Sequence, residues 1–283
     1  MKNITIIGVG LIGGSFALDL RGLFPEAKIQ GIDSNPEHIK EAMSLGVVDN
    51  EGTLDDLEST ELVVLAIPVD VTTQVLPEVL DKIGKDTIVM DMGSTKGAIC
   101  DSVANHPNRR NFIACHPIAG TEYSGPSAAI KGLYTGKTNI ICEVEKTAFK
   151  LQEKVLEVFK KLEMRIRYME PQSHDKHIAY MSHLSHISSF MLGKTVIDKE
   201  KNERDIFDMA GSGFASTVRL AKSNPVTWTS IFKQNKDNIL ETLEEYIANL
   251  EGFKTLMESD DFEGVFEEMA NTNHIKEILK GIN

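Results

Sequence analysis

Basic residues, cysteines and long apolar runs are all scarce in this sequence of 283 residues. The 30 Lys and Arg are outnumbered by 42 Asp and Glu, and the net charge of −12 argues against a nucleic-acid partner, because such a partner requires a basic surface. Three cysteines without CxxC spacing indicate reduced thiols and a cytoplasmic protein. The longest apolar run, Leu62 to Val69, is far shorter than the ~20 residues of a membrane helix. We therefore expect neither a membrane span nor a signal peptide.

The first 170 residues alternate short apolar runs with helical patterns. This rhythm predicts an α/β fold with a doubly wound parallel sheet, whose strands are apolar because helices cover both faces. We expect strands at Ile4–Ile7, Lys28–Ile32, Leu62–Ile67, Thr87–Met90, Phe112–Cys115 and Asn139–Val144. We expect helices between them, for example at Leu11–Leu20, Pro36–Leu45 and Ala148–Leu162.

The pattern becomes helical after about residue 170, which predicts two domains, 1–169 and 170–283. Expected helical stretches are Gln172–Val196, Phe214–Ala221, Thr227–Met257 and Asp261–Ile282. The segment Ile178–Phe190 is apolar on most of its circumference, so we expect it to be buried on all sides. A half-chain with such surfaces covers them best by pairing, and the prediction is a homodimer joined through the helical half.

A glycine turn follows the first strand. Residues 8 to 13 read GVGLIG, and Asp33 ends the second strand 20 residues after Gly13. This order is typical of a Rossmann dinucleotide-binding domain, in which the pyrophosphate lies on the helix N-terminus and the acid binds the ribose. The predicted cofactor site consists of Gly8, Gly10, Leu11, Ile12, Gly13 and Asp33. The predicted cofactor is NAD, because Asp33 would repel the 2′-phosphate of NADP and no arginine follows it. The alternative is a glycine-rich turn without a ligand.

Polar clusters follow two later strands, at the edge where such sheets bind ligands. His116 is a candidate acid or base there, and the alternative is a histidine that only shapes the turn. Ser94 is either a site residue or a helix N-cap. For Lys96 we prefer a solvated position in the first helical turn.

Five segments in order, GVGLIGGS, GSTKG, HPIAGTEYSG, SHLSH and TVRLAKSNPVTW, resemble the prephenate dehydrogenase family over nearly the whole chain. The resemblance implies a Rossmann domain followed by a helical domain for substrate binding and dimerisation. It also implies oxidation of prephenate, a dicarboxylate, with NAD(P) and loss of CO2 to give 4-hydroxyphenylpyruvate in tyrosine biosynthesis.

The resemblance also implies roles for individual residues. His116 matches the catalytic histidine and Ser94 the serine that hydrogen-bonds it; we expect His116 to act as a general base with a pKa near 6–7. Arg219 matches the arginine that holds a substrate carboxylate. The remaining substrate-site matches are Thr121, His183 and His186. This chain has Ser216 where many relatives have an acid, which affects how the substrate side chain is recognised.

Four histidines precede or lie within SHLSH, but they do not suggest a metal site. At 100° per residue, His174 and His183 point in opposite directions, as do His177 and His186, and no HExxH or cysteine pair is present. We expect His174 and His177 to occupy a partly exposed first helical turn. Trp228, the only tryptophan, is either an apolar anchor or a pocket wall.

Three alternative functions remain open from the sequence. The first alternative is an enzyme of the same family that acts on arogenate instead of prephenate. The second is another small NAD(P) dehydrogenase of the β-hydroxyacid type, and the third is a non-catalytic dinucleotide sensor.

Overall fold

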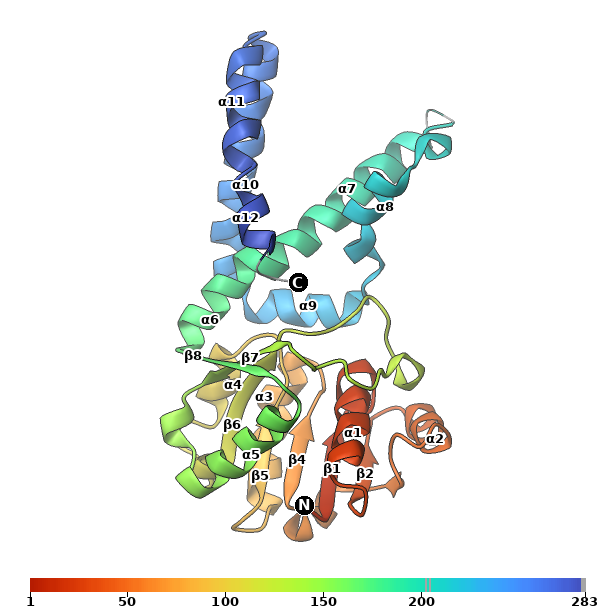
Figure 1. The fold of residues 1–283 in the computed structure, drawn as a ribbon, viewed down its shortest axis with the longest axis vertical. Coiled ribbons are helices and arrows are strands. Elements are labelled where there is room, and N and C mark those ends of the chain that lie inside the picture. Colours follow the sequence, from red (N-terminus) through yellow and green to blue (C-terminus); the bar gives the residue numbers. More distant parts are fainter. Residues whose placement is uncertain (202, 204, 281–283) are drawn as a thin grey trace. The chain divides into compact units, whose positions relative to one another are not determined.

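The computed structural model describes the chain except for residues 202, 204 and 281–283 (Figure 1). The chain divides into two compact units, Met1–Lys236 and Asp237–Asn283. Every predicted site residue lies in the first unit. No helix in the described part of the chain is long and apolar enough to cross a membrane.

An eight-stranded sheet organises the first unit, in the order β3-β2-β1-β4-β5-β6-β7-β8. Its strands are β1 (Asn3–Ile7), β2 (Lys28–Ile32), β3 (Asn50–Glu51), β4 (Leu62–Leu65), β5 (Ile88–Asp91), β6 (Phe112–Pro117), β7 (Thr138–Cys142) and β8 (Arg165–Met169). All neighbours pair in parallel except β6 and β7, which are antiparallel, so the expected doubly wound parallel sheet is confirmed with one antiparallel pair. The order reverses direction beside β1, with β2 on one side and β4 on the other. Ligands of doubly wound sheets bind at such a switch point.

Helices cover both faces of the sheet (Figure 1). On one face α1 (Leu11–Leu23), α2 (Pro36–Ser44) and α5 (Phe149–Lys161) enclose a core that includes Phe16, Leu20 and Phe159. On the other face α3 (Val69–Lys82) and α4 (Gly97–Ser102) enclose a second core, which includes Leu76 and Ile99. This double cover explains why the central strands are continuous apolar runs.

The long segment between β6 and β7 returns over α1. Its backbone N–H groups at Ile130 and Gly132 donate to the side chains of Ser15 and Asp19, at 2.8 and 2.6 Å. The buried hydroxyl of Tyr134 donates to the carbonyl of Ile12 at 2.7 Å. These bonds fix the segment that follows His116 against the first helix of the sheet.

The rest of the first unit is helical, as expected, but it is broken more often. It contains α6 (Pro171–Ile178), a π-helical turn (Ala179–His183), α7 (Leu184–Glu200), α8 (Ser212–Thr217), a 3-10 helix (Arg219–Lys222) and α9 (Pro225–Gln234). Asn224 caps α9 by accepting from the N–H of Val226 at 2.9 Å. The expectation that Ile178–Phe190 is buried on all sides was wrong for the single chain, because the side of the helix that carries Met181 is not covered.

The second unit contains all of α10 (Lys236–Glu258) except its first residue, together with α11 (Phe262–Thr272) and α12 (Ile275–Lys280). Asp261 caps α11 by accepting from the N–H of Gly264 at 2.9 Å. The predicted helix Thr227–Met257 is divided at Asn235, and the predicted helix Asp261–Ile282 is divided between α11 and α12; its last residues, 281 and 282, lie outside the described residues.

Candidate active site

The glycine turn between β1 and α1 has the shape of an anion cradle. Gly8 has φ +92°, and a Cβ there would lie 2.5 Å from the carbonyl oxygen of Ala66, while a Cβ on Gly13 would lie 2.0 Å from the oxygen of Gly8. At Gly10 the nearest atom to an added Cβ is 3.9 Å away, so the backbone there is open to a ligand. The first backbone hydrogen bond of α1 is donated by Gly14 to the carbonyl of Gly10. The N–H groups of residues 11–13 precede it and have no acceptor within the helix. This cradle therefore fits a pyrophosphate.

Asp33 lies just after β2 and faces this turn. Its Oδ2 accepts from the N–H of Val9 at 3.1 Å, and its Oδ1 accepts from the N–H of Asn35 at 2.9 Å. The Nδ1 of His38 lies 3.4 Å from Oδ1. The carboxylate is therefore held beside the glycine turn, where the ribose hydroxyls of a bound dinucleotide need an acceptor.

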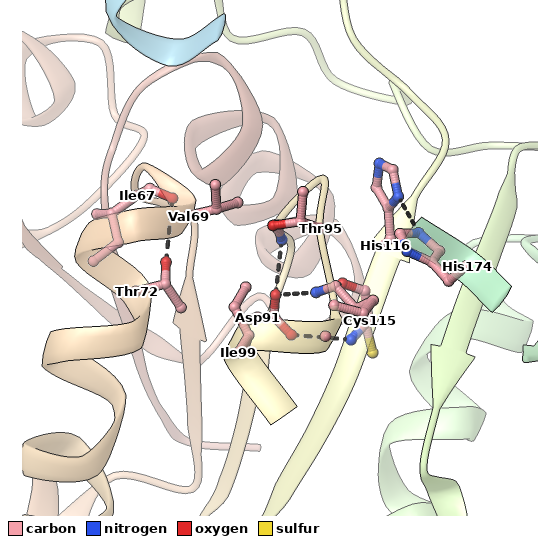
Figure 2. Close-up of polar contacts among 12 residues, drawn as sticks. Ile67, Val69, Thr72, Asp91, Thr95, Ile99, Cys115, His116 and His174 are labelled. Carbon is pink, nitrogen blue, oxygen red and sulfur yellow. Dashed lines mark hydrogen bonds and ion pairs between the residues drawn. The ribbon is translucent and has the colours of Figure 1, made fainter. Parts of the chain in front are cut away.

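His116 is buried within β6, at the same edge of the sheet as the glycine turn, because β1 and β6 end in the same direction. Its Nδ1 lies 2.7 Å from the Nε2 of His174, and the two rings meet edge to face at 5.0 Å (Figure 2). Burial is the main cause that lowers the pKa of His116 well below its usual value, and the neighbouring His174, Lys96 and His183 lower it further. The expectation of a pKa near 6–7 is therefore corrected downward.

His174 is fully buried, so its expected position in a partly exposed turn was wrong; His177 is exposed as expected. The Nδ1 of His174 lies 2.7 Å from the Oδ1 of Asp175. The same carboxylate accepts from the backbone N–H groups of Lys96 and Gly97, at 2.7 and 2.8 Å. Burial alone would raise the pKa of Asp175, but the hydrogen bonds from His174 and these two N–H groups lower it below its usual value.

Lys96 is also buried, which overturns the preference for a solvated lysine. Its Nζ forms an ion pair with Asp91 at the end of β5 and donates to the carbonyl of Cys115 at 2.7 Å. Lys96 thus links the end of β5 to the residue that precedes His116 in β6. A buried lysine needs such a partner, because an uncompensated charge there is costly.

Ser94 is half-buried in the turn after β5, but it is not the N-cap of α4, since that position is Lys96. Among the described residues Ser94 has no hydrogen bond, and His116 pairs with His174 instead. The serine-to-histidine bond implied by the resemblance is therefore absent from this arrangement of the chain.

Arg219 lies at the start of the 3-10 helix and reaches the loop that follows β6. Its Nη1 donates to Oε2 of Glu122 at 3.1 Å, and its side chain is 52% exposed. Thr121, the preceding residue, accepts the backbone N–H of Tyr123 at 3.2 Å. The arginine that is expected to bind a carboxylate thus already faces a carboxylate of the protein.

His183 and His186 both pack against Trp228. The ring of His186 stacks on Trp228 at 3.4 Å, and the ring of His183 meets it edge to face at 6.0 Å. Burial lowers the pKa of His183 to about 4. Its Nδ1 lies 3.2 Å from the amide nitrogen of Asn235, and its Nε2 has no hydrogen-bond partner within the described part of the chain. Trp228 therefore contacts both histidines, and its ring also lies 5.6 Å from that of Phe232.

Sequence reasoning missed His174, Asp175, Glu122 and Asn235. Glu122 lies within the HPIAGTEYSG segment, so that segment was the available signal. His174 and Asp175 are neighbours in α6 and Asn235 follows α9, and none of the three stands in a segment with characteristic spacing. No group of three or more metal-ligating side chains occurs among the residues that the structure describes.

An anion cradle at the switch point, an acid after β2 and a buried histidine at the same sheet edge define the nucleotide-binding domain of a dehydrogenase. Comparison with known proteins specifies which one. The sequence model of the prephenate dehydrogenase nucleotide-binding domain matches residues 16–168, and that of the prephenate dehydrogenase dimerization domain matches residues 170–271. The chain belongs to the prephenate dehydrogenase family.

Individual relatives agree with this assignment. The chain is 31% identical over 271 residues to prephenate dehydrogenase of Bacillus subtilis, covering 94% of this chain and 73% of that protein. A solved structure of Aquifex aeolicus prephenate dehydrogenase with hydroxyphenyl propionate and NAD+ is 34% identical, with a TM-score of 0.87 and 96% coverage of both chains. The structure of Synechocystis arogenate dehydrogenase is 26% identical, with a TM-score of 0.76 and coverage of 97% and 99%.

Proposed function

We propose that this protein catalyses the NAD-dependent oxidative decarboxylation of prephenate to 4-hydroxyphenylpyruvate, a step of tyrosine biosynthesis. The observation that carries the proposal is the buried His116 at the carboxyl end of β6. Its Nδ1 faces His174, which leaves Nε2 as the ring atom for a substrate. The likeness to prephenate dehydrogenases supports the choice of reaction.

The cofactor site is proposed to be the cradle beside β1. Bound NAD supplies the acceptor for the hydride that leaves the substrate. The backbone N–H groups of Leu11, Ile12 and Gly13 would hold its pyrophosphate, and Gly8 and Gly10 would allow the close approach. Asp33 would accept both adenosine ribose hydroxyls.

His116 acts as the general base in this proposal. Its Nε2 takes the proton of the ring hydroxyl while the carbon that bears this hydroxyl is oxidised. Its low pKa keeps the ring neutral, and therefore able to accept a proton, at neutral pH. Ser94 is placed at the end of the neighbouring strand, where its hydroxyl can donate to the forming carbonyl oxygen. Loss of CO2 then gives an aromatic phenol, which needs little help from the protein.

Arg219 binds one substrate carboxylate. The guanidinium has five donors, of which Glu122 uses one, so a second carboxylate can bind the rest of the fork. A local cation is required because the protein as a whole carries −12 and repels a dianion. His183, His186 and Thr121 would line the remainder of the pocket.

A direct assay of NADH formation tests the proposal, with prephenate, arogenate and a panel of β-hydroxyacids offered separately. We expect the highest kcat/KM with prephenate. Preference for arogenate would change the substrate and keep the rest of the site, whereas preference for a β-hydroxyacid would replace the reaction. Tight NADH binding without turnover on any of these substrates would make the protein a dinucleotide sensor.

A further inference from the structure

We infer that His116 and His174 form a two-imidazole relay, in which Asp175 fixes the tautomers of both rings and the positive charge created by taking the substrate's proton ends on His174. The inference rests on the proposed function for its substrate proton. It adds two positioning residues, His174 and Asp175, that do not contact the substrate.

The tautomers follow from the hydrogen bonds, starting at the carboxylate. An ionised Asp175 can only accept, so the Nδ1 of His174, 2.7 Å away, must carry a proton. The Nε2 of His174 is then an acceptor, and the Nδ1 of His116, 2.7 Å from it, must donate. A neutral His116 with a proton on Nδ1 has a free lone pair on Nε2. The relay therefore presents the basic atom of His116 to the substrate.

Asp175 is held rigidly enough to set this direction. Two backbone N–H groups from the start of α4 donate to it, those of Lys96 and Gly97. The side chain of Asn235 donates to the backbone carbonyl of Asp175 at 2.7 Å and also lies 3.2 Å from His183. The two N–H groups thus fix the carboxylate and Asn235 fixes the backbone that carries it, and pre-organisation of this kind keeps a positioning group in a productive geometry.

The proton balance is simple. The O–H bond of the substrate breaks and its proton bonds to Nε2 of His116. The Nδ1 proton of His116 then passes to Nε2 of His174, which becomes an imidazolium beside Asp175. His116 is left neutral with the substrate's proton on Nε2. After the product leaves, the proton on Nε2 of His174 returns to Nδ1 of His116, and the proton on Nε2 of His116 passes to water. No oxidant or reductant is needed for these transfers.

The charges around the two rings favour His174 as the holder of the proton. His116 lies near the cation Lys96 and near the imidazoles of His174 and His183, and no carboxylate bonds to it within the described residues. His174 also feels Lys96, but it is hydrogen-bonded to Asp175, and Asp91 lies within electrostatic range. Burial lowers the pKa of both rings, and the two carboxylates offset part of this effect only for His174.

Three variants of the full-length protein test the relay. Asp175→Asn removes the charge, and its amide can donate to Nδ1 of His174, which reverses both tautomers and leaves Nε2 of His116 protonated. His174→Gln keeps an acceptor for His116 and a donor for Asp175 but cannot take a proton. His177→Gln, three residues further along the same helical segment and exposed, is the matched control.

We expect kcat with the substrate of the wild-type enzyme to fall about 10²–10⁴-fold in Asp175→Asn and about 10–10²-fold in His174→Gln. His177→Gln should stay within about twofold, and NAD binding should be unchanged in all three. Nitrogen-15 NMR of labelled histidines, without substrate, should show His116 unprotonated at Nε2 in wild type and in His174→Gln, and protonated at Nε2 in Asp175→Asn.

Wild-type kcat in His174→Gln would overturn the relay, as would an Nε2-protonated His116 in the wild-type protein. A purely structural role for Asp175 would lower the melting temperature and leave the His116 tautomer unchanged, which also overturns it. If Asp175→Asn does not fold, His174→Gln and the wild-type spectrum decide. If the wild-type protein turns over none of the substrates, the proposed function fails, while the spectra still decide the tautomers and Asp175's role.

Discussion

At the scale of single residues, the burial of His116 changes the expected pH dependence. Its pKa lies well below 6.5, so the neutral base persists as the pH falls below neutrality. We expect kcat/KM to stay level from pH 9 down to about 6 and to decline only at lower pH. The measurement is kcat/KM across this range with saturating NAD. A midpoint at or above 6.5 would contradict this account of the burial.

The variant His116→Asn tests the base itself. Asparagine is similar in size and hydrogen-bonds, but it cannot accept the proton, so kcat should fall about 10²–10⁴-fold. NAD should bind as before, because the cradle at Gly8–Gly13 is separate from this side chain. A variant that keeps its rate but loses stability or NAD affinity would reduce His116 to a residue that shapes the strand end.

Arg219→Ala should chiefly raise KM. A contact with a carboxylate that is equally strong in the ground and transition states contributes uniform binding. Loss of this contact weakens substrate binding and leaves kcat nearly unchanged. Because the guanidinium is half-exposed and already paired with Glu122, we expect a rise in KM of about 10–10²-fold. Steady-state kinetics with Arg219→Lys as the comparison shows whether the bidentate fork matters. A collapsed kcat with unchanged KM would place Arg219 in the chemistry.

The limits of sequence reasoning are clearest at this scale. Motif order located His116 and Arg219, since each stands in a characteristic segment. The burial of Lys96 and His174 was not predictable, because a lysine after a strand and a histidine near a helix start are usually solvated. Each is paired with a carboxylate close to it in sequence, Asp91 and Asp175, but the contacts of His174 with His116 and of the Lys96 N–H with Asp175 form only in the folded chain.

At the scale of elements, the turn after β2 should determine cofactor choice. Asp33 is fixed by the N–H groups of Val9 and Asn35, so it cannot readily turn away from a 2′-phosphate. We expect kcat/KM with NAD to exceed that with NADP by about 10²-fold, since a like-charge contact costs several kcal/mol. Parallel assays with both cofactors check this. Equal or better kcat/KM with NADP would sink the prediction.

The apolar runs predicted six strands to within two residues at most ends, because buried parallel strands have no polar alternation to obscure them. Two strands were missed: β3 has only two residues, and β8 is an edge strand whose exposed arginines, Arg165 and Arg167, interrupt the apolar pattern. The π-helical turn Ala179–His183 was invisible to an argument based on 100° per residue. Asn235 follows the last residue of α9. Its side chain contacts both the backbone carbonyl of Asp175 and the ring of His183, and no helical periodicity predicts such a link.

At the scale of the whole molecule, the buried histidines should make stability depend on pH. Burial lowers the pKa of His183 to about 4 and also lowers the pKa values of His116, His174 and His186. Below pH 6.5 the unfolded chain therefore binds protons that the folded chain does not. The contribution of these neutral histidines to the free energy of unfolding is complete above pH 6.5. It is lost as the pH falls toward 4, by about 1.4 kcal/mol per pH unit for each such histidine.

Denaturant unfolding at fixed protein concentration, between pH 7.5 and 4.5, measures this loss. The variant His183→Asn should show a shallower decline than wild type by about one proton, because one of the depressed groups is gone. The exposed His177→Gln is the control and should keep the wild-type slope. A free energy of unfolding that is constant from pH 7 to 5 would contradict the low pKa values.

The second unit supports pairing of two copies. The helix α11 exposes Phe262, Phe266 and Met269, and α10 exposes a second stripe that includes Leu250 and Met257. Apolar residues spaced in this way on one helix face usually mark an interface, and this region matches the family's dimerization domain. We therefore propose a homodimer that buries these stripes.

Light scattering at micromolar concentration should give a mass of about twice 31.3 kDa. The double variant Phe266→Glu with Met269→Glu should shift the mass toward the monomer, because two carboxylates would have to be desolvated in the interface. Thr255→Glu, at an exposed position on the side of α10 away from Leu250 and Met257, is the charge control and should leave the dimer intact. A wild-type mass of 31.3 kDa at this concentration would refute the dimer, and the exposed stripes would then need a different partner.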